Sequence, residues 1–155
     1  MASILITGPL DGEPVDLGTT KMRILQDGTS TDGRLGITVA TLAPHTEGPP
    51  QHLHRRHDEG FYVISGTARF SSGEVTHDAP AGSLVVIPPE VPHTFANPGD
   101  EPMVMLSTFT PALYVQYFRD MAAMIAGGQP VTPESVGEIM ARYSTAPAVG
   151  HHDAG

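Results

Sequence analysis

The segment that decides the fold is Thr46–Glu59, which reads TEGPPQHLHRRHDE. His52 and His54 stand two positions apart in it, so on an extended strand both imidazoles leave the same face. Glu59 comes five residues after His54, beyond a polar stretch long enough to turn the chain. It opens the apolar run 60–64, which can pair back antiparallel with the histidine-bearing strand. The spacing predicts that two imidazoles and one carboxylate meet at one end of these strands.

A fourth candidate ligand is His93, which follows Pro92 at the start of a later apolar run. Three imidazoles and one carboxylate suit a borderline divalent metal, because imidazole binds Zn, Cu, Fe and Ni while carboxylate suits harder ions such as Mn. Spacing alone leaves another interpretation open, in which His52 and His54 are exposed residues of a hairpin loop.

The chain around this segment has the pattern of an all-β domain. Short apolar runs that alternate with polar residues are separated by Gly and Pro turns, at intervals of roughly 8–12 residues, which is typical of a sandwich or barrel. The expected strands are Met22–Gln26, Leu35–Leu42, Glu59–Ile64, Thr67–Ser71, Ser83–Ile87, His93–Ala96 and Met103–Phe109.

The hydrophobic period changes after Phe109. Apolar residues then recur at helical spacing and predict two short helices packed against the β body. The first ends at Gly127-Gly128, and the second begins at Thr132-Pro133-Glu134, an N-cap followed by a first-turn proline. The apolar faces consist of Tyr114, Phe118, Met121 and Ile125, and of Val136, Ile139, Met140 and Tyr143. We expect the tail 146–155 to be frayed.

Length and composition narrow the function. The chain has 155 residues, enough for one domain over 1–155, and its 17 acidic against 8 basic residues give a net charge of −9. This charge argues against nucleic-acid binding. No apolar run reaches membrane-spanning length and the N-terminus lacks a signal-peptide pattern, so we expect a cytoplasmic protein that does not bind membranes. The absence of cysteine excludes disulfides, thiolate nucleophiles and cysteine-based zinc sites.

The histidine-bearing segment, followed by Gly66, resembles the first conserved motif of the cupin superfamily, G(X)5HXH(X)3,4E(X)6G. The stretch 82–97 resembles the second motif, G(X)5PXG(X)2H(X)3N. All four family ligand positions are filled, by His52, His54, Glu59 and His93. Thr46 and Glu90 stand where the family has glycine, and a side chain there is expected to strain or reshape a loop by about 1 kcal/mol without touching a ligand.

The resemblance implies a single cupin β-barrel (a double-stranded β-helix, or jelly roll) over about 20–110, with a helical extension over about 112–144. It implies one divalent transition metal ion per chain, either Fe, Mn, Ni, Cu, Co or Zn. It also implies a homodimer, formed through an edge strand or the outer barrel face. Tyr62 and Ile64, which face away from the ligands, are candidates for that interface or for packing against the other sheet.

The motifs together with the helical extension look like small bacterial cupins grouped with quercetin 2,3-dioxygenase. This likeness implies a dioxygenase that acts on a phenolic or enolic, flavonol-like small molecule, with Glu59 as both ligand and general base. Two alternatives remain open, a non-oxidative cyclase or isomerase of secondary metabolism and a small-molecule-binding cupin without turnover. Thiol dioxygenases usually lack the ligating glutamate, and cupin regulators need a DNA-binding domain for which this chain has no room.

Strand alternation sends Phe61 and Val63 to the ligand side, and Phe95 shares a face with His93, so these three are expected to line the substrate pocket. Ordinary barrel filling is the alternative for them. Other polar and aromatic residues are expected to have plainer roles. Arg55, Arg56 and His57 are expected to be solvated loop residues; the alternatives are a substrate clamp for the arginines and a position behind the ligands for His57. Tyr114, Tyr117 and Phe118 are expected to pack the first helix rather than to form a lid. No site role is expected for His45, His77, His151 and His152.

Overall fold

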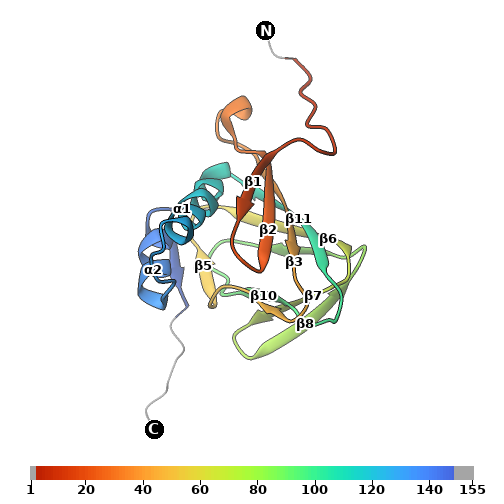
Figure 1. Cartoon of the computed structure of the whole chain (residues 1–155), viewed down its shortest axis with the longest axis vertical. Coiled ribbons are helices and arrows are strands. Elements are labelled where there is room, and N and C mark those ends of the chain that lie inside the picture. The colour runs from red at the N-terminus through yellow and green to blue at the C-terminus, as the bar shows by residue number, and fades with distance from the viewer. Residues whose placement is uncertain (1–2, 149–155) are drawn as a thin grey trace.

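Two antiparallel sheets packed face to face form the body of the molecule, and both helices lie on one side of it (Figure 1). The computed structural model describes residues 3–148. Its strands are β1 (Glu13–Asp16), β2 (Thr20–Gln26), β3 (Gly36–Leu42), β4 (Thr46–Glu47), β5 (His52–His54), β6 (Asp58–Ser65), β7 (Thr67–Ser72), β8 (Val75–Pro80), β9 (Leu84–Ile87), β10 (Thr94–Asn97), β11 (Met103–Thr110) and β12 (Thr145–Pro147). Its helices are α1 (Val115–Ala126) and α2 (Pro133–Ala141), with short 3-10 turns η1 (Thr29–Thr31) and η2 (Ala112–Tyr114).

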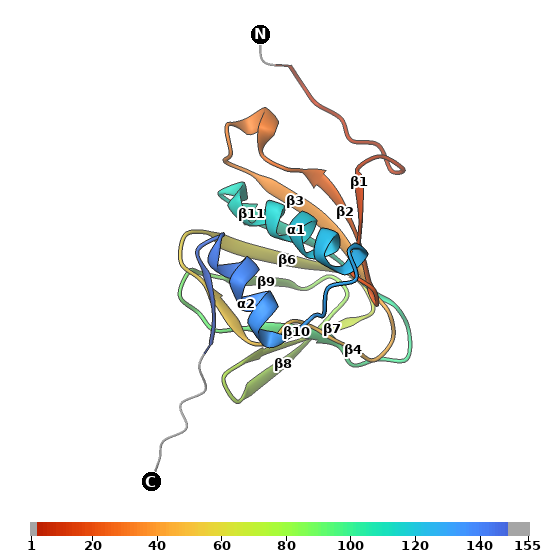
Figure 2. The same cartoon turned by 60° about the vertical axis from the view of Figure 1, so that its left-hand side comes forward.

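The larger sheet has the order β1-β2-β3-β11-β6-β9, and the smaller one β4-β10-β7-β8. Strands β5 and β12 form a separate two-stranded sheet. Figure 2 shows both helices on the same side of the strands, with α2 in front. This arrangement confirms the expected all-β jelly roll with two short C-terminal helices. No helix in residues 3–148 has the length and hydropathy needed to span a membrane.

The core lies between the two sheets, as the period-2 pattern predicts. Strands β3 and β11 bury every second side chain, and β6 buries Glu59, Phe61 and Val63 while exposing Tyr62 and Ile64. Leu42 and Met103 are fully buried. The burial of one strand face is the main stabilising term in such a barrel.

The structure differs from the expected strands in three places. The histidine-bearing strand β5 does not pair back with β6, which lies between β11 and β9 instead. It pairs with β12, with Thr145 opposite His54 and Pro147 opposite His52. Ala146 and Pro147 therefore belong to a strand and not to a frayed tail, while residues 149–155 of the expected tail lie outside the described residues. Strand β8 was not expected, because only Ala79 is buried in it and so it shows no apolar alternation.

The helical extension closes one side of the barrel. Thr132 caps α2 through a reciprocal pair of hydrogen bonds with Ser135, and Pro133 occupies the first turn, as predicted. In α1, Arg119 donates to the carboxylates of Glu13 at 2.7 Å and Asp27 at 2.9 Å, which ties the helix to the larger sheet. The apolar face of α2 packs into the core as expected. The buried face of α1 differs from the expected one: Val115, Tyr117, Met121 and Met124 are buried, whereas Phe118 and Ile125 are only partly buried.

Candidate metal centre

Four buried side chains meet where β5, β6 and the start of β10 come together. His52 and His54 project from β5 on the same face, Glu59 follows the first residue of β6, and His93 immediately precedes β10. A backbone bridge between His52 and His93, with N–O distances of 2.9 and 3.0 Å, joins the two histidine-bearing segments. The four residues predicted as ligands are thus neighbours, each with an exposed fraction of 3% or less.

The polar ends of these side chains converge on one point. Nε2 of His93 lies 2.9 Å and Nε2 of His54 lies 3.0 Å from the same Glu59 oxygen, Oε2. The His52 ring lies 4.5 Å from the His93 ring and 4.8 Å from the His54 ring, centroid to centroid. The ligand atoms of the three histidines all lie within 4.8 Å of one another, a spacing that a single metal ion can bridge.

Hydrogen bonds on the far side of each ring set the tautomers. Nδ1 of His52 lies 2.9 Å from the Pro50 carbonyl oxygen, and Nδ1 of His93 lies 2.9 Å from the Val91 carbonyl oxygen. A carbonyl oxygen only accepts, so in both rings Nδ1 carries the proton. The Nε2 atoms of His52 and His93 are then bare lone pairs when the rings are neutral, which is the form that binds a metal.

The electrostatics of the cluster favour neutral His52 and His54 rings beside an ionised Glu59 carboxylate. Burial, together with the neighbouring His93, lowers the pKa of His52 to about 4, and burial also lowers the pKa of His54. Burial by itself would raise the pKa of Glu59, but the surrounding imidazoles of His54, His57 and His93 hold it well below its usual range. The low pKa of Glu59 thus depends on N–H donors or positive charge facing its carboxylate, and a bound metal ion would supply that positive charge while the imidazoles stay neutral.

This donor set fits a divalent metal ion. Among the residues that the structure describes, Nε2 of His54 is buried with no hydrogen-bond partner, since its approach to Glu59 is poorly aligned for one. A buried polar atom without a partner is unfavourable, and a cation between the lone pairs and the carboxylate would satisfy all of them. His52, His54, His93 and Glu59 are the side chains that would hold it.

His57 does not occupy the solvated loop position that was expected. Its flanking residues Arg56 and Asp58 are exposed, but the His57 ring is turned inward with an exposed fraction of 1%. Its Nε2 atom lies 3.6 Å from Glu59 Oε1, the oxygen that does not face His93. Within the described residues neither ring nitrogen of His57 has a hydrogen-bond partner. The ligand atoms of His54, His57 and Glu59 all lie within 4.8 Å of one another, so His57 adjoins the predicted ligand set.

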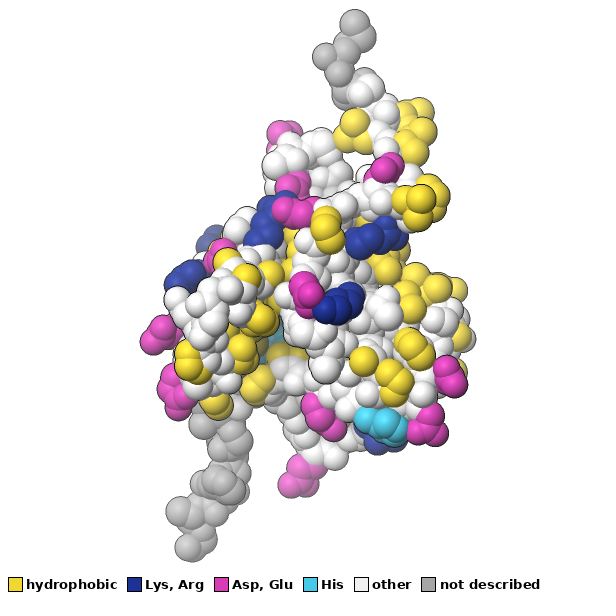
Figure 3. All heavy atoms as spheres, viewed as in Figure 1, with side chains coloured by type: hydrophobic (Ala, Val, Ile, Leu, Met, Phe, Trp, Pro, Cys, Tyr) yellow, Lys and Arg dark blue, Asp and Glu magenta, His cyan; other side chains and the backbone are white. Residues whose placement is uncertain are grey.

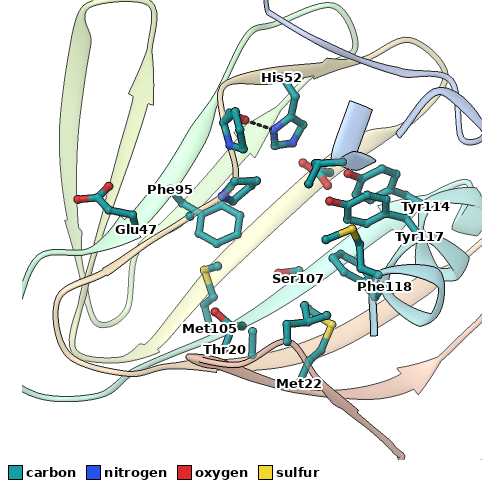
Figure 4. Close-up of a pocket in the computed structure, with 18 of the residues that line it drawn as sticks. Thr20, Met22, Glu47, His52, Phe95, Met105, Ser107, Tyr114, Tyr117 and Phe118 are labelled. Carbon is teal, nitrogen blue, oxygen red and sulfur yellow. Dashed lines mark hydrogen bonds between the residues drawn. The ribbon is translucent and has the colours of Figure 1, made fainter. Parts of the chain in front are cut away.

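A largely apolar cavity of about 310 Å³ opens beside the cluster, and His52 and Glu59 form part of its wall (Figure 4). Phe61 and Phe95 line it, at positions that strand alternation predicts. Val63 does not line it, because this side chain lies two positions further along β6 and is packed completely into the core. Hydrophobic side chains also border the recess between the helices and the strands in the space-filling view (Figure 3).

The helical extension supplies the opposite wall of the cavity. Tyr114 and Tyr117 stack with ring centroids 4.5 Å apart, and their hydroxyl ends point into the cavity (Figure 4). Tyr114 also contacts the His54 ring edge-on, with a centroid distance of 4.4 Å. Burial, reinforced by Tyr117 and Glu59, raises the pKa of Tyr114 well above its usual value, so it remains a neutral phenol. These tyrosines pack as expected, and they line the cavity as well.

The other candidate residues that the structure describes lie away from the cluster. Arg55 and Arg56 are exposed, and Arg55 approaches Glu90 at 3.5 Å on the surface. His45 pairs with Asp100 on the surface, and His77 is exposed on β8; His151 and His152 lie outside the described residues. Glu90 has a backbone φ of 67°, the left-handed conformation that the missing glycine would adopt without strain.

Comparisons with known proteins agree with this fold. Residues 38–109 match the family described as the cupin domain. An RmlC-like cupin from Shewanella frigidimarina is 25% identical, with a TM-score of 0.60 over 72% of this chain and 95% of that one. KdgF from a Halomonas species is 16% identical, with a TM-score of 0.62 over 70% of this chain and 94% of that one. A predicted oxalate decarboxylase from Thermotoga maritima is also 16% identical, with a TM-score of 0.60 over 70% of this chain and 99% of that one. A search of curated proteins found no match.

The sheets, the motif residues and these matches together define a small β-barrel protein of the jelly-roll class with a histidine and glutamate cluster at its mouth. The region 38–109 of the chain is thus cupin-like, both in sequence and in fold.

Proposed function

We propose that this protein is a metal-dependent cupin enzyme, a dioxygenase that acts on an uncharged phenolic or enolic small molecule of the flavonol type. The observation that carries the proposal is the position of the cluster. Imidazole lone pairs and an ionised carboxylate converge at the wall of an apolar, aromatic cavity. Such a cavity, with few polar groups at one end, is typical of a small-molecule site.

The metal would be held by His52, His54, His93 and Glu59. A divalent ion there supplies a Lewis acid that lowers the pKa of a phenol or enol hydroxyl bound beside it. Imidazole-rich sites take several first-row metals, so availability and geometry decide which one is bound. The chain's own contribution is the rigid placement of the four donors by β5, β6 and the segment before β10.

Glu59 is the group that accepts the substrate proton in this proposal. Its pKa is held well below the usual range, so it is ionised at neutral pH. Its Oε2 atom faces His54 and His93, whereas Oε1 faces His57. Glu59 forms part of the cavity wall, so its carboxylate lies where it can accept a proton from a substrate bound there. The deprotonated substrate is an electron-rich enolate, which dioxygen can oxidise with both oxygen atoms entering the product.

The cavity lining supports an uncharged aromatic substrate over a small anion. No Lys or Arg is present among the described residues that line it, and its walls include Phe61, Phe95 and Phe109. A dianion such as oxalate would lose its hydration there with no cationic side chain to replace it, which is costly. A flat phenolic ring instead replaces water against aromatic side chains, a favourable exchange. Tyr114 and Tyr117 remain neutral and can donate hydrogen bonds to substrate oxygens.

The test is an oxygen-electrode assay with quercetin as the probe. Metal-free protein is loaded in turn with Fe²⁺, Mn²⁺, Co²⁺, Ni²⁺, Cu²⁺ and Zn²⁺, and oxygen uptake is compared with product formation. The proposal predicts uptake of dioxygen in proportion to quercetin consumed, with at least one of these ions. Product formed without oxygen would show a cyclase or isomerase instead. Tight binding of quercetin without turnover, under air and with every ion, would leave only a binding role.

A further inference from the structure

His54 is oriented by a part of the chain that lies outside both histidine motifs. His52 and His93 each hold Nδ1 against a carbonyl two residues earlier, within their own loops. His54 has no such local partner. Its Nδ1 atom lies 2.7 Å from the hydroxyl oxygen of Thr145, which is 91 positions later in β12.

The hydrogen bonds of Thr145 fix which nitrogen of His54 carries the proton. The hydroxyl has one proton, which it donates to the Tyr143 carbonyl oxygen at 3.1 Å. The Thr145 oxygen is then left to accept, so Nδ1 of His54 is the donor. A neutral His54 with its proton on Nδ1 has a bare lone pair on Nε2, directed at the cluster.

The strand that carries Thr145 is held against β5 over its whole length. Thr145 lies opposite His54 in the register, and Pro147 lies opposite His52. On either side of this pairing, the Arg55 N–H donates to the Ser144 carbonyl at 2.9 Å and the Ala148 N–H donates to the Gln51 carbonyl at 2.8 Å. Docking of β12 therefore places the Thr145 hydroxyl and orders the backbone of two ligands together.

We propose that Thr145 is a positioning residue for the metal centre and that docking of β12 is coupled to metal binding. The inference rests on the proposed function only in that the cluster must bind a metal. Coupling of this kind is reciprocal: β12 orients His54 for the metal, and a metal bound to His54 stabilises β12 in its docked position. The cupin domain match ends at residue 109, so this support comes from the C-terminal extension.

Three variants separate positioning from packing. Thr145→Val keeps the shape of the side chain but removes the acceptor, whereas Thr145→Ser keeps the hydroxyl. Thr38→Val is the matched control, because Thr38 is also fully buried and its hydroxyl has no hydrogen-bond partner among the described residues. The affinity of each metal-free protein for Co²⁺ is measured by visible absorption in competition with a chelator, after circular dichroism has shown that each is folded.

We expect Thr145→Val to bind Co²⁺ about 10–100-fold more weakly than wild type, the usual effect of losing the partner of a metal-ligating histidine. Thr145→Ser and Thr38→Val should bind close to the wild-type value. Wild-type affinity in Thr145→Val would overturn the positioning role while leaving the metal centre intact. A wild-type protein that binds no Co²⁺ would instead overturn the metal centre itself.

Hydrogen exchange tests the coupling between metal binding and the docking of β12. It uses the wild-type protein, so the result does not depend on the folding of a variant. Co²⁺ should slow the exchange of the backbone amides in a peptide covering β12, as well as that of amides around Glu59. Slower exchange around Glu59 with no change in β12 would contradict the coupling, because a metal bound to His54 would then leave the strand unaffected.

Discussion

Nε2 of His93 and Oε2 of Glu59 lie 2.9 Å apart, although 34 positions separate the two residues. Nδ1 of His93 donates to the Val91 carbonyl, so a neutral His93 directs a lone pair at a carboxylate. Two electron-rich atoms at this distance repel each other unless a positive charge, either a proton on Nε2 or a metal ion, lies between them. A cation at this point accounts for the burial of both residues and for the convergence of His52 and His54 on the same place.

The two roles of Glu59 can be separated with Glu59→Gln, which keeps an oxygen donor but loses the charge. We expect weaker metal affinity, because a neutral amide attracts a cation less than a carboxylate does. If Glu59 is also the base, the metal-saturated variant should consume quercetin roughly 10²–10⁴-fold more slowly than wild type, the usual contribution of a general base. The measurement is the turnover rate at saturating metal, with metal content determined on the same sample.

Asp58 provides the matched control for this prediction. It is adjacent to Glu59 in the sequence but exposed, on the opposite face of β6. Asp58→Asn removes the same charge and should leave both affinity and turnover unchanged. Wild-type turnover by metal-saturated Glu59→Gln would exclude the base role and leave Glu59 as a ligand alone.

The stability of the metal-free protein should fall as the pH falls below about 6.5. The pKa of His52 is lowered to about 4 in the folded protein, against 6.5 for an ordinary histidine. Between these values the unfolded chain takes up a proton that the folded protein does not, so protonation favours unfolding. From pH 7 to pH 5 this linkage corresponds to a loss of about 2 kcal/mol. Below pH 4.5 Glu59 adds to the loss, because its pKa is also lower in the folded state.

Urea unfolding of metal-free wild type and His52→Gln at pH 7 and pH 5 measures this linkage. Between the two pH values, wild type should lose about 2 kcal/mol more than the variant, since glutamine does not titrate. An equal change in the free energy of unfolding for both proteins would show that His52 does not carry the effect.

The sequence predicts the metal cluster better than its surroundings. His52 and His54 could be placed on one face because strand periodicity fixes the direction of each side chain. The cupin resemblance placed Glu59 and His93 with them, since the strand pairing expected to bring Glu59 there does not occur. The inward turn of His57 could not be predicted, because its neighbours Arg55, Arg56 and Asp58 are all exposed and give the segment a polar pattern.

Long-range pairing accounts for the other differences between sequence and structure. Thr145 reaches His54 only because β12 pairs with β5, and three residues of β12 carry no periodic signal. Val63 shares a strand face with Phe61, but alternation does not reveal where along β6 the cavity ends. Pairing partners and cavity limits depend on contacts between distant segments, which local patterns do not encode.

We expect the protein to form a homodimer through the outer face of β6 and β9. Tyr62 lies opposite Leu84 across these strands, and with Ile64 and Val86 it forms an apolar patch with exposed fractions between 46% and 65%. Strand β9 is also the last strand of its sheet, and an exposed apolar edge strand favours pairing with another chain. A second copy would cover both features, and closed two-fold dimers are the commonest oligomers.

Sedimentation velocity at micromolar concentration checks the dimer. Ile64→Asp should shift the protein toward the monomer, because it places a charge within the patch. Val75→Asp is the control, since Val75 is similarly exposed but lies on β8 in the other sheet. Wild type sedimenting only as a monomer of 16.4 kDa would refute the prediction.

The most direct test of the account is the metal content of the protein purified without a histidine tag. Elemental analysis after mild dialysis should find about one divalent transition metal ion per chain in wild type. His93→Ala should retain almost none, because it removes one of the converging donors. His77→Ala, which changes an exposed histidine on β8, should retain the wild-type amount. Wild type without stoichiometric metal, or His93→Ala with undiminished metal, would contradict the metal centre proposed here.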